Sequence, residues 1–140
     1  MGLRGPKRTP TKLLRLRGSP LAKKRADPPA PPGRPPVPSY LSSEERRVFR
    51  RVVDHLERMG ILASTDGEML GRYAVFYVLW SRVNQIIQVE GETYTTKDRA
   101  GFVTIQRRPE SSFLLAYHAE MARIEASFGL TPASRAALGV

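Results

Sequence analysis

The sequence predicts a mainly α-helical protein, with a small helical body of three main helices, one β-hairpin and a short C-terminal helix behind a basic, proline-rich arm. Apolar residues recur at helical spacing over three long stretches, and β-branched residues replace that pattern only near residues 93–106. Ten of the twelve prolines lie in residues 1–38. We therefore divide the chain into an arm and linker, residues 1–38, and a helical body, residues 39–140, that we expect to oligomerise.

The arm carries almost all of the net charge. Residues 1–38 contain ten lysines and arginines against one acid, whereas residues 39–140 contain thirteen against twelve acids. Such a split indicates a polyanionic partner, either nucleic acid or an anionic membrane surface. Residues 12–17 form a short candidate helix, and two turns are unstable alone, so we expect the arm to order on a partner. Seven prolines in residues 27–38 predict an extended, semi-rigid linker.

The first body helix is predicted to begin at Ser42, which forms a capping box with Glu45, and to end at Gly60. Its apolar side chains recur at helical spacing: Val48, Phe49, Val52, Val53, Leu56 and Met59. Four arginines lie on the opposite side, and we interpret them as a solvated face: Arg46, Arg47, Arg50 and Arg51. We expect a buried turn at residues 61–62.

A long central helix is predicted from Thr65 to Glu90, with a capping box formed by Thr65 and Glu68 and a stop at Gly91. Residues 73–80 are all apolar or aromatic, so this helix is apolar most of the way round. A helix of that kind is buried on more than one side. Flanking arginines exclude a membrane span, which needs roughly 20 apolar residues. We therefore expect a central pillar whose second face also needs cover.

A change of period after the pillar predicts a hairpin. Residues 93–96 and 102–106 are β-branched and aromatic, and a five-residue loop separates them. Two strands alone are marginally stable in water, so we expect the hairpin to lean on the helices or on another chain.

A third helix is predicted from Pro109, because proline is favoured at a first helical position, to a stop at Gly129. Its apolar stripe consists of Phe113, Leu114, Tyr117, Met121, Ile124 and Phe128. The pair Thr131 and Pro132 then starts the short C-terminal helix, with a cap followed by a proline at its first position.

The sequence shows no pattern of residues that is typical of a catalytic site. The chain has no cysteine, and its two histidines, His55 and His118, are interpreted as structural or surface residues. The spacing of His118 and Glu120 matches half of a zinc deaminase signature, but the cysteines that complete it do not exist. No phosphate-binding loop, dinucleotide fingerprint or nucleophile elbow is present. We predict no catalytic residue, no metal site, no cofactor and no enzymatic activity.

The arm is the candidate nucleic-acid interface. Lysine and arginine contacts to phosphates supply affinity that does not depend on base sequence. The arm has no aromatic residue, so stacking on bases is not supported. The alternative is a solubilising tail. The expected phosphate contacts are Lys7, Arg8, Lys12, Arg15, Arg17, Lys23, Lys24 and Arg25.

Several blocks in order give a more specific indication. They are the arm GPKRTPTKLLRLRGSPLAKKR, the proline-rich linker, the block SYLSSEERRVFRRVVDHLERMGIL, the start of the pillar and the tail FGLTPASRAAL. This arrangement resembles the small terminase subunit of tailed bacteriophages, in the family with a Gly, Arg/Lys and Pro-rich arm and an FGLTP-S-R tail. One departure is Arg108-Pro109, where members often carry Asn-Pro at the start of the third helix.

The resemblance implies a non-enzymatic factor that binds viral double-stranded DNA at the packaging site and recruits the large terminase subunit, in the cytoplasm of the bacterial host. Small terminase subunits form rings, so it also implies a cyclic homo-oligomer in which a neighbouring subunit covers the second face of the pillar. The expected interface residues are Phe76, Val78, Leu79, Trp80 and Val83. No membrane partner is expected.

Two other functions remain open from the sequence. One is a dimeric regulator or nucleoid-type protein that binds duplex DNA. The other is an interaction module whose arm and C-terminal residues 131–140 dock a protein partner.

Overall fold

The computed structural model describes residues 18–23 and 31–134. Within these ranges the chain is mainly helical, and its long helices are α2 (Ser43–Arg58), α3 (Gly67–Glu90) and α4 (Pro109–Ser127). An antiparallel hairpin joins α3 to α4, with strands β1 (Thr93–Lys97) and β2 (Val103–Arg107). The predicted fold class is confirmed, including the short C-terminal helix, because residues 132–134 are helical where the described chain ends.

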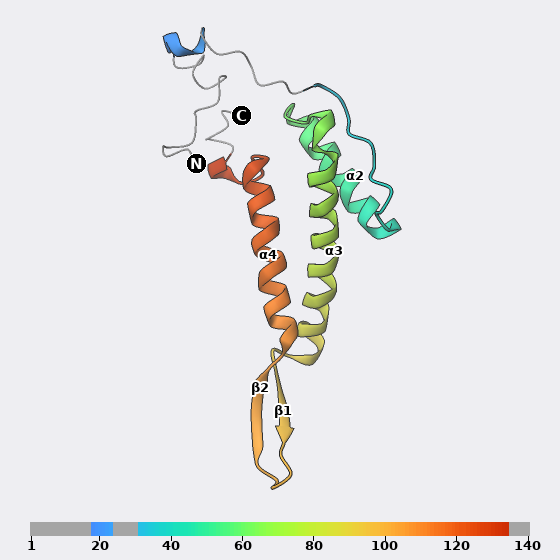
Figure 1. The fold of residues 1–140 in the computed structure, drawn as a ribbon, viewed down its shortest axis with the longest axis vertical. Helices are drawn as coiled ribbons and strands as arrows, with labels where there is room; N and C mark the ends of the chain where they lie inside the picture. The colour runs from blue at the N-terminus through green and yellow to red at the C-terminus, as the bar shows by residue number, and fades with distance from the viewer. Residues whose placement is uncertain (1–17, 24–30, 135–140) are drawn as a thin grey trace, which may run out of the picture.

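Helix α3 occupies the centre of the body (Figure 1). It packs against α2 and, antiparallel, against α4, and the hairpin projects beyond the joined ends of α3 and α4. We call the end of the α3–α4 pair that α2 covers the covered end, and the opposite end, which carries β1 and β2, the hairpin end. No described helix is long and apolar enough to cross a membrane.

Helix α2 begins as the sequence predicts. The Ser42 backbone N–H donates to the Glu45 carboxylate over 2.7 Å, and the Glu45 N–H donates to the Ser42 hydroxyl over 3.4 Å. These two bonds are the predicted capping box. The helix is followed by Gly60, whose φ of +67° is the left-handed conformation that favours glycine at a helix C-terminus.

The start of α3 differs from the predicted capping box of Thr65 and Glu68. A 3-10 turn, Ser64–Asp66, precedes the helix, and the Asp66 carboxylate accepts the Ala63 backbone N–H over 2.9 Å. The Asp66 side chain therefore stabilises the turn that precedes α3, and Thr65 is exposed. The linker crosses this point, because a Cβ added to Gly67 would lie 3.1 Å from the Pro35 Cβ.

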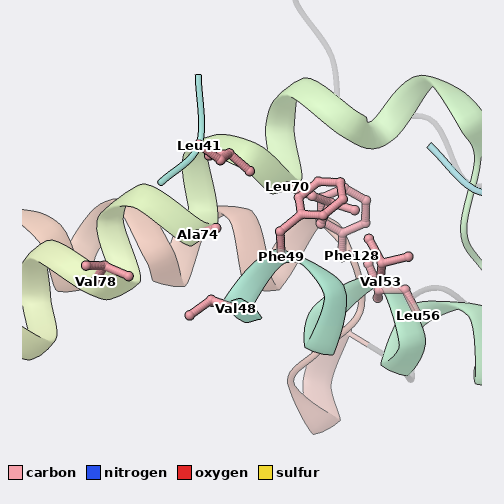
Figure 2. Packing of buried hydrophobic residues seen from close by; sticks show 9 residues of the cluster. All are labelled: Leu41, Val48, Phe49, Val53, Leu56, Leu70, Ala74, Val78 and Phe128. Atoms are coloured by element: carbon pink, nitrogen blue, oxygen red, sulfur yellow. The ribbon is translucent and has the colours of Figure 1, made fainter. Parts of the chain in front are cut away.

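The hydrophobic core lies at the covered end, between α2, the first half of α3 and the turn after α4 (Figure 2). Phe49, Leu70 and Phe128 meet there, one from each of these three segments. The full cluster is Leu41, Val48, Phe49, Val53, Leu56, Leu70, Ala74, Val78 and Phe128. No residue of α3 beyond Val78 is buried, so the core extends along α3 only as far as Val78.

The last part of the predicted linker lies on the body. Pro35 and Pro38 are buried, and the Pro31 carbonyl accepts the Ser64 backbone N–H over 3.0 Å. A Cβ on Gly71 would lie 3.0 Å from the Pro38 Cγ, so a glycine allows this close approach. Residues 31–38 are thus part of the packed structure, although the sequence groups them with the arm.

The hairpin forms at the predicted place, with its five-residue loop one position later, at residues 98–102. The Asp98 carboxylate accepts the backbone N–H groups of Ala100 and Phe102 over 2.9 and 2.8 Å, which fixes the turn. Every residue of β2 is exposed. The expected support from the helices is therefore missing for this strand in the single chain.

Arg108, the residue that departs from the family pattern, ties the base of the hairpin to α3. Its guanidinium pairs with the Glu90 carboxylate over 2.8 Å and lies 5.8 Å from the centre of the Tyr94 ring. It precedes α4 without making a side-chain cap, and Pro109 opens the helix as predicted. At the other end of α4, the Ser134 N–H donates to the Thr131 hydroxyl, which is the predicted cap of the C-terminal helix.

Candidate nucleic-acid interface

Most of the predicted phosphate contacts lie outside the described residues. Of the eight, only Lys23 is described, and it is exposed just after the 3-10 turn Pro20–Ala22. The other seven are Lys7, Arg8, Lys12, Arg15, Arg17, Lys24 and Arg25. The arm therefore stays a prediction as a binding element.

The point at which the arm joins the body is well defined. Pro32 forms a β-bridge with Ala63, and the Pro31 carbonyl accepts hydrogen bonds from both the backbone and the hydroxyl of Ser64. These contacts place the start of the body at the turn between α2 and α3.

A single cation from the linker neutralises part of the α2 surface. The Arg34 guanidinium pairs with the Asp54 and Glu57 carboxylates, the latter over 3.1 Å. All three side chains are about half exposed, so the pairs contribute little to stability, about 0–1 kcal/mol each. Their consequence is electrostatic, because one cation offsets part of the negative charge of the two carboxylates on the outer side of α2.

The remaining cations of α2 form one surface. Its five arginines are all exposed, and among the described residues none pairs with a carboxylate. We call them the arginine face: Arg46, Arg47, Arg50, Arg51 and Arg58. The sequence identifies four of these residues as a solvated face. The pairing of Arg34 with the acids beside them is a contact between segments, which no local pattern could reveal.

The residues of the predicted oligomer interface differ in how far they are buried. Val78 is 1% exposed in the core, so it is not a surface residue of the single chain. Phe76, Leu79, Trp80 and Val83 are half-buried. Phe76 faces Tyr117 of α4, with 6.1 Å between ring centres, so α4 of the same chain covers part of the face that the sequence assigns to a neighbour.

A different apolar surface is left uncovered at the hairpin end. Val89 is 79% exposed, Ile105 71% and Leu115 57%, although they come from α3, β2 and α4. We call the following exposed side chains the hairpin-end patch: Ile86, Val89, Phe102, Val103, Ile105, Phe113 and Leu115. Exposed apolar surfaces of this extent mark interaction sites. The sequence pattern does not identify this patch. Ile86, Val89 and Leu115 lie outside the predicted apolar stripes, and the other four residues belong to the predicted third-helix stripe or to the predicted hairpin.

No described group of residues suggests catalysis. His55 and His118 are both exposed, and no group of three or more His, Asp or Glu side chains in the described part of the chain is placed to hold a metal ion. Burial and a hydrogen bond to Glu125 raise the pKa of Tyr73, which keeps this phenol neutral rather than reactive. The two notable surfaces of the described chain are the arginine face of α2 and the hairpin-end patch.

Comparison with protein families matches residues 46–140 to the family described as phage terminase, small subunit. The match covers more than half of the chain. The chain belongs to this family. Comparison with curated proteins and with solved structures gives no match. Family membership gives this terminase small subunit a role in phage packaging, in a family that is generally regulatory rather than catalytic.

Proposed function

We propose that the protein recognises viral DNA at the packaging site through its basic arm and recruits the large terminase subunit, which starts genome packaging in the bacterial host cytoplasm. Membership in the family supports this function. The observation that carries the DNA-binding part is the segregation of charge, since residues 1–38 hold ten of the twenty-three lysines and arginines and one acid. A chain segment of that composition binds polyanions by releasing their counterions.

We further propose that the body assembles as a cyclic homo-oligomer. The hairpin-end patch supports assembly, because its seven large apolar side chains are 37–79% exposed in the single chain. Leu79, Val83 and Ile86 follow one another at helical spacing along α3, so the half-buried interface residues lead into this patch. We therefore propose that the contact between subunits lies closer to the hairpin end than Val78 does.

Deletion of residues 1–26 tests the DNA-binding arm. The truncated protein should lose most of its affinity for duplex DNA, and the steep fall of affinity with salt should flatten, because about 0.9 of the logarithmic slope is lost per phosphate contact. Its number of subunits should be unchanged. Undiminished DNA binding by the truncated protein would refute the arm as the binding element.

Light scattering and binding assays separate this function from its alternatives. A closed assembly larger than a dimer supports the terminase ring, whereas a dimer supports a DNA-binding regulator or nucleoid-type protein. Association with the large subunit without any shift of DNA would favour the interaction module.

A further inference from the structure

We propose that the arginine face of α2 binds the phosphodiester backbone of duplex DNA, as a folded contact beside the arm. This inference rests on the proposed function, because it takes DNA as the partner. It adds a binding site within the body, on residues outside the predicted set of phosphate contacts.

The acids of α2 do not neutralise this face. Glu44 pairs with Arg82 of α3 over 2.9 Å, and Glu45 is held in the capping box at the N-terminus of the helix. Asp54 and Glu57 both pair with Arg34 of the linker. Among the described residues, none of the four carboxylates of the helix pairs with one of its five arginines.

The arrangement of the arginines is unfavourable for the isolated helix. Arg46 and Arg50 are four residues apart, as are Arg47 and Arg51, so each pair places like charges on neighbouring turns. Like-charge pairs at this spacing destabilise a helix. Asp54 offsets part of this repulsion, because it lies four residues from both Arg50 and Arg58, and an anionic ligand would convert the remaining repulsion into attraction.

Neutral groups position three of the guanidinium groups without reducing their charge. Arg51 lies over the Tyr77 ring, 4.8 Å from its centre. Arg46 donates to the Ser39 carbonyl over 3.3 Å, and Arg58 donates to the Asp54 carbonyl over 3.1 Å. Arg47 and Arg50 have no partner among the described residues and remain free for a ligand. The planar guanidinium fork matches the oxygens of a phosphate.

The C-terminal end of the arginine face lies near the point where the described linker joins the body. The arm meets the body where Pro32 pairs with Ala63, five residues after Arg58 at the end of α2. DNA held by the arm would therefore lie next to the C-terminal end of the arginine face. Phosphate contacts position a protein on DNA without reading bases, so we expect the face to set orientation rather than sequence preference.

The test is a full-length R47A/R50A double variant. Both residues are exposed and have no partner in the part of the chain that the structure describes, and removing them relieves the like-charge repulsion, so the fold and oligomeric mass should be unchanged. Affinity for duplex DNA should fall by roughly 10-fold or more at 0.1 M salt, and the salt slope should decrease by about 2. The charge-preserving variant R47K/R50K should retain most of the salt slope, which a purely structural effect would not predict.

The matched control is K97A/R99A, which removes the same charge from exposed residues at the hairpin end. It should bind DNA with nearly wild-type affinity. Equal losses in both variants would mean that only net charge matters and would overturn the proposal. R34Q gives a second check, because it exposes Asp54 and Glu57 beside the face. Its loss of DNA affinity should exceed that of a single cation.

The outcomes separate this proposal from the proposed function. If the full-length protein binds DNA and R47A/R50A binds equally well, the arginine face is refuted and the arm stands. If the full-length protein binds no DNA, both fail. If R47A/R50A keeps its DNA affinity and loses the large subunit, the face binds an acidic protein surface instead, and the DNA proposal is overturned.

Discussion

The covered end and the hairpin end are built from the same two helices, and only one of them has a core. At the covered end, α2 and the turn after α4 enclose the first half of α3, and Phe49, Leu70 and Val78 are each at most 1% exposed. At the hairpin end, α3 and α4 have only each other, and Val89 and Leu115 are more than half exposed.

This difference separates folding from assembly. Burying an apolar side chain stabilises a protein by about 1.5–3 kcal/mol, and the covered end obtains that stabilisation within one chain. The hairpin end leaves the same kind of side chain in water, where only a partner can provide it. Substitutions at the two ends should therefore have different effects, one on the fold and the other on the oligomeric mass.

The largest effect is expected from Phe49→Ala at the covered end. Phe49 is 1% exposed and contacts the centre of the core, so its truncation should cost about 3–5 kcal/mol. That is a large part of the 5–15 kcal/mol that stabilises a typical domain. Denaturant unfolding followed by circular dichroism measures the loss. A cost below about 1 kcal/mol would contradict the single core described here.

A smaller effect on the fold, but a large one on assembly, is expected from V89E/L115E at the hairpin end. Both side chains are exposed in the single chain, so the carboxylates should leave its thermal unfolding almost unchanged. A contact between subunits through the hairpin-end patch would bury these charges unpaired, which is costly. Light scattering should therefore show folded monomers or small species in place of the full assembly.

The control for this variant is Ala126→Glu, which adds a carboxylate at an exposed position of α4 near the covered end. It should keep the assembled mass. An unchanged mass for V89E/L115E would exclude the hairpin-end patch from the interface. A charge at Val78, by contrast, should unfold the chain, because that side chain belongs to the core.

The sequence predicts the covered end well because its signals are local. Ser42 and Glu45 are three residues apart, and the stripe from Val48 to Leu56 follows one helical period. The entrance to α3 was predicted less well. There the linker packs over Gly67, and Asp66, whose carboxylate accepts the Ala63 N–H, takes the N-cap position in place of Thr65. That contact joins segments some thirty residues apart, so no local pattern encodes it.

The candidate sites show the same limit. Periodicity identifies which residues of α3 are apolar but not which segment covers them, so the predicted interface includes Val78, which lies in the core of its own chain. Whether the hairpin-end patch is exposed depends on how far α2 extends along α3. That depends on tertiary packing rather than on the local sequence. The sequence shows the arginine face as a run of charges. Its net charge also depends on Arg34, which pairs with Asp54 twenty residues away in sequence.

The smallest effect of the three comparisons is expected from one hydroxyl at each end. At the covered end, the Tyr73 hydroxyl donates to the Glu125 carboxylate over 2.8 Å and ties α3 to α4. At the hairpin end, the Tyr94 hydroxyl donates to the Gln106 side chain over the same distance, but in the exposed hairpin. Tyr73→Phe should cost about 1–2 kcal/mol because it leaves a partly buried carboxylate without its donor. Tyr94→Phe should cost a few tenths, because water replaces the lost bond.

Alkaline pH sharpens the same contrast. Burial, followed by the Glu125 hydrogen bond, raises the pKa of Tyr73 above its ordinary value of about 10. Below pH 10 the phenol is protonated in both the folded and the unfolded chain, so its stabilising contribution is complete. Above pH 10 the unfolded chain releases the proton and the folded chain does not, so stability falls by up to about 1.4 kcal/mol per pH unit. Denaturant unfolding at pH 9 and pH 11 should show this loss in the wild type and in Tyr94→Phe, and a smaller loss in Tyr73→Phe. Equal losses in all three proteins would mean that the Tyr73 hydroxyl does not tie the two helices together.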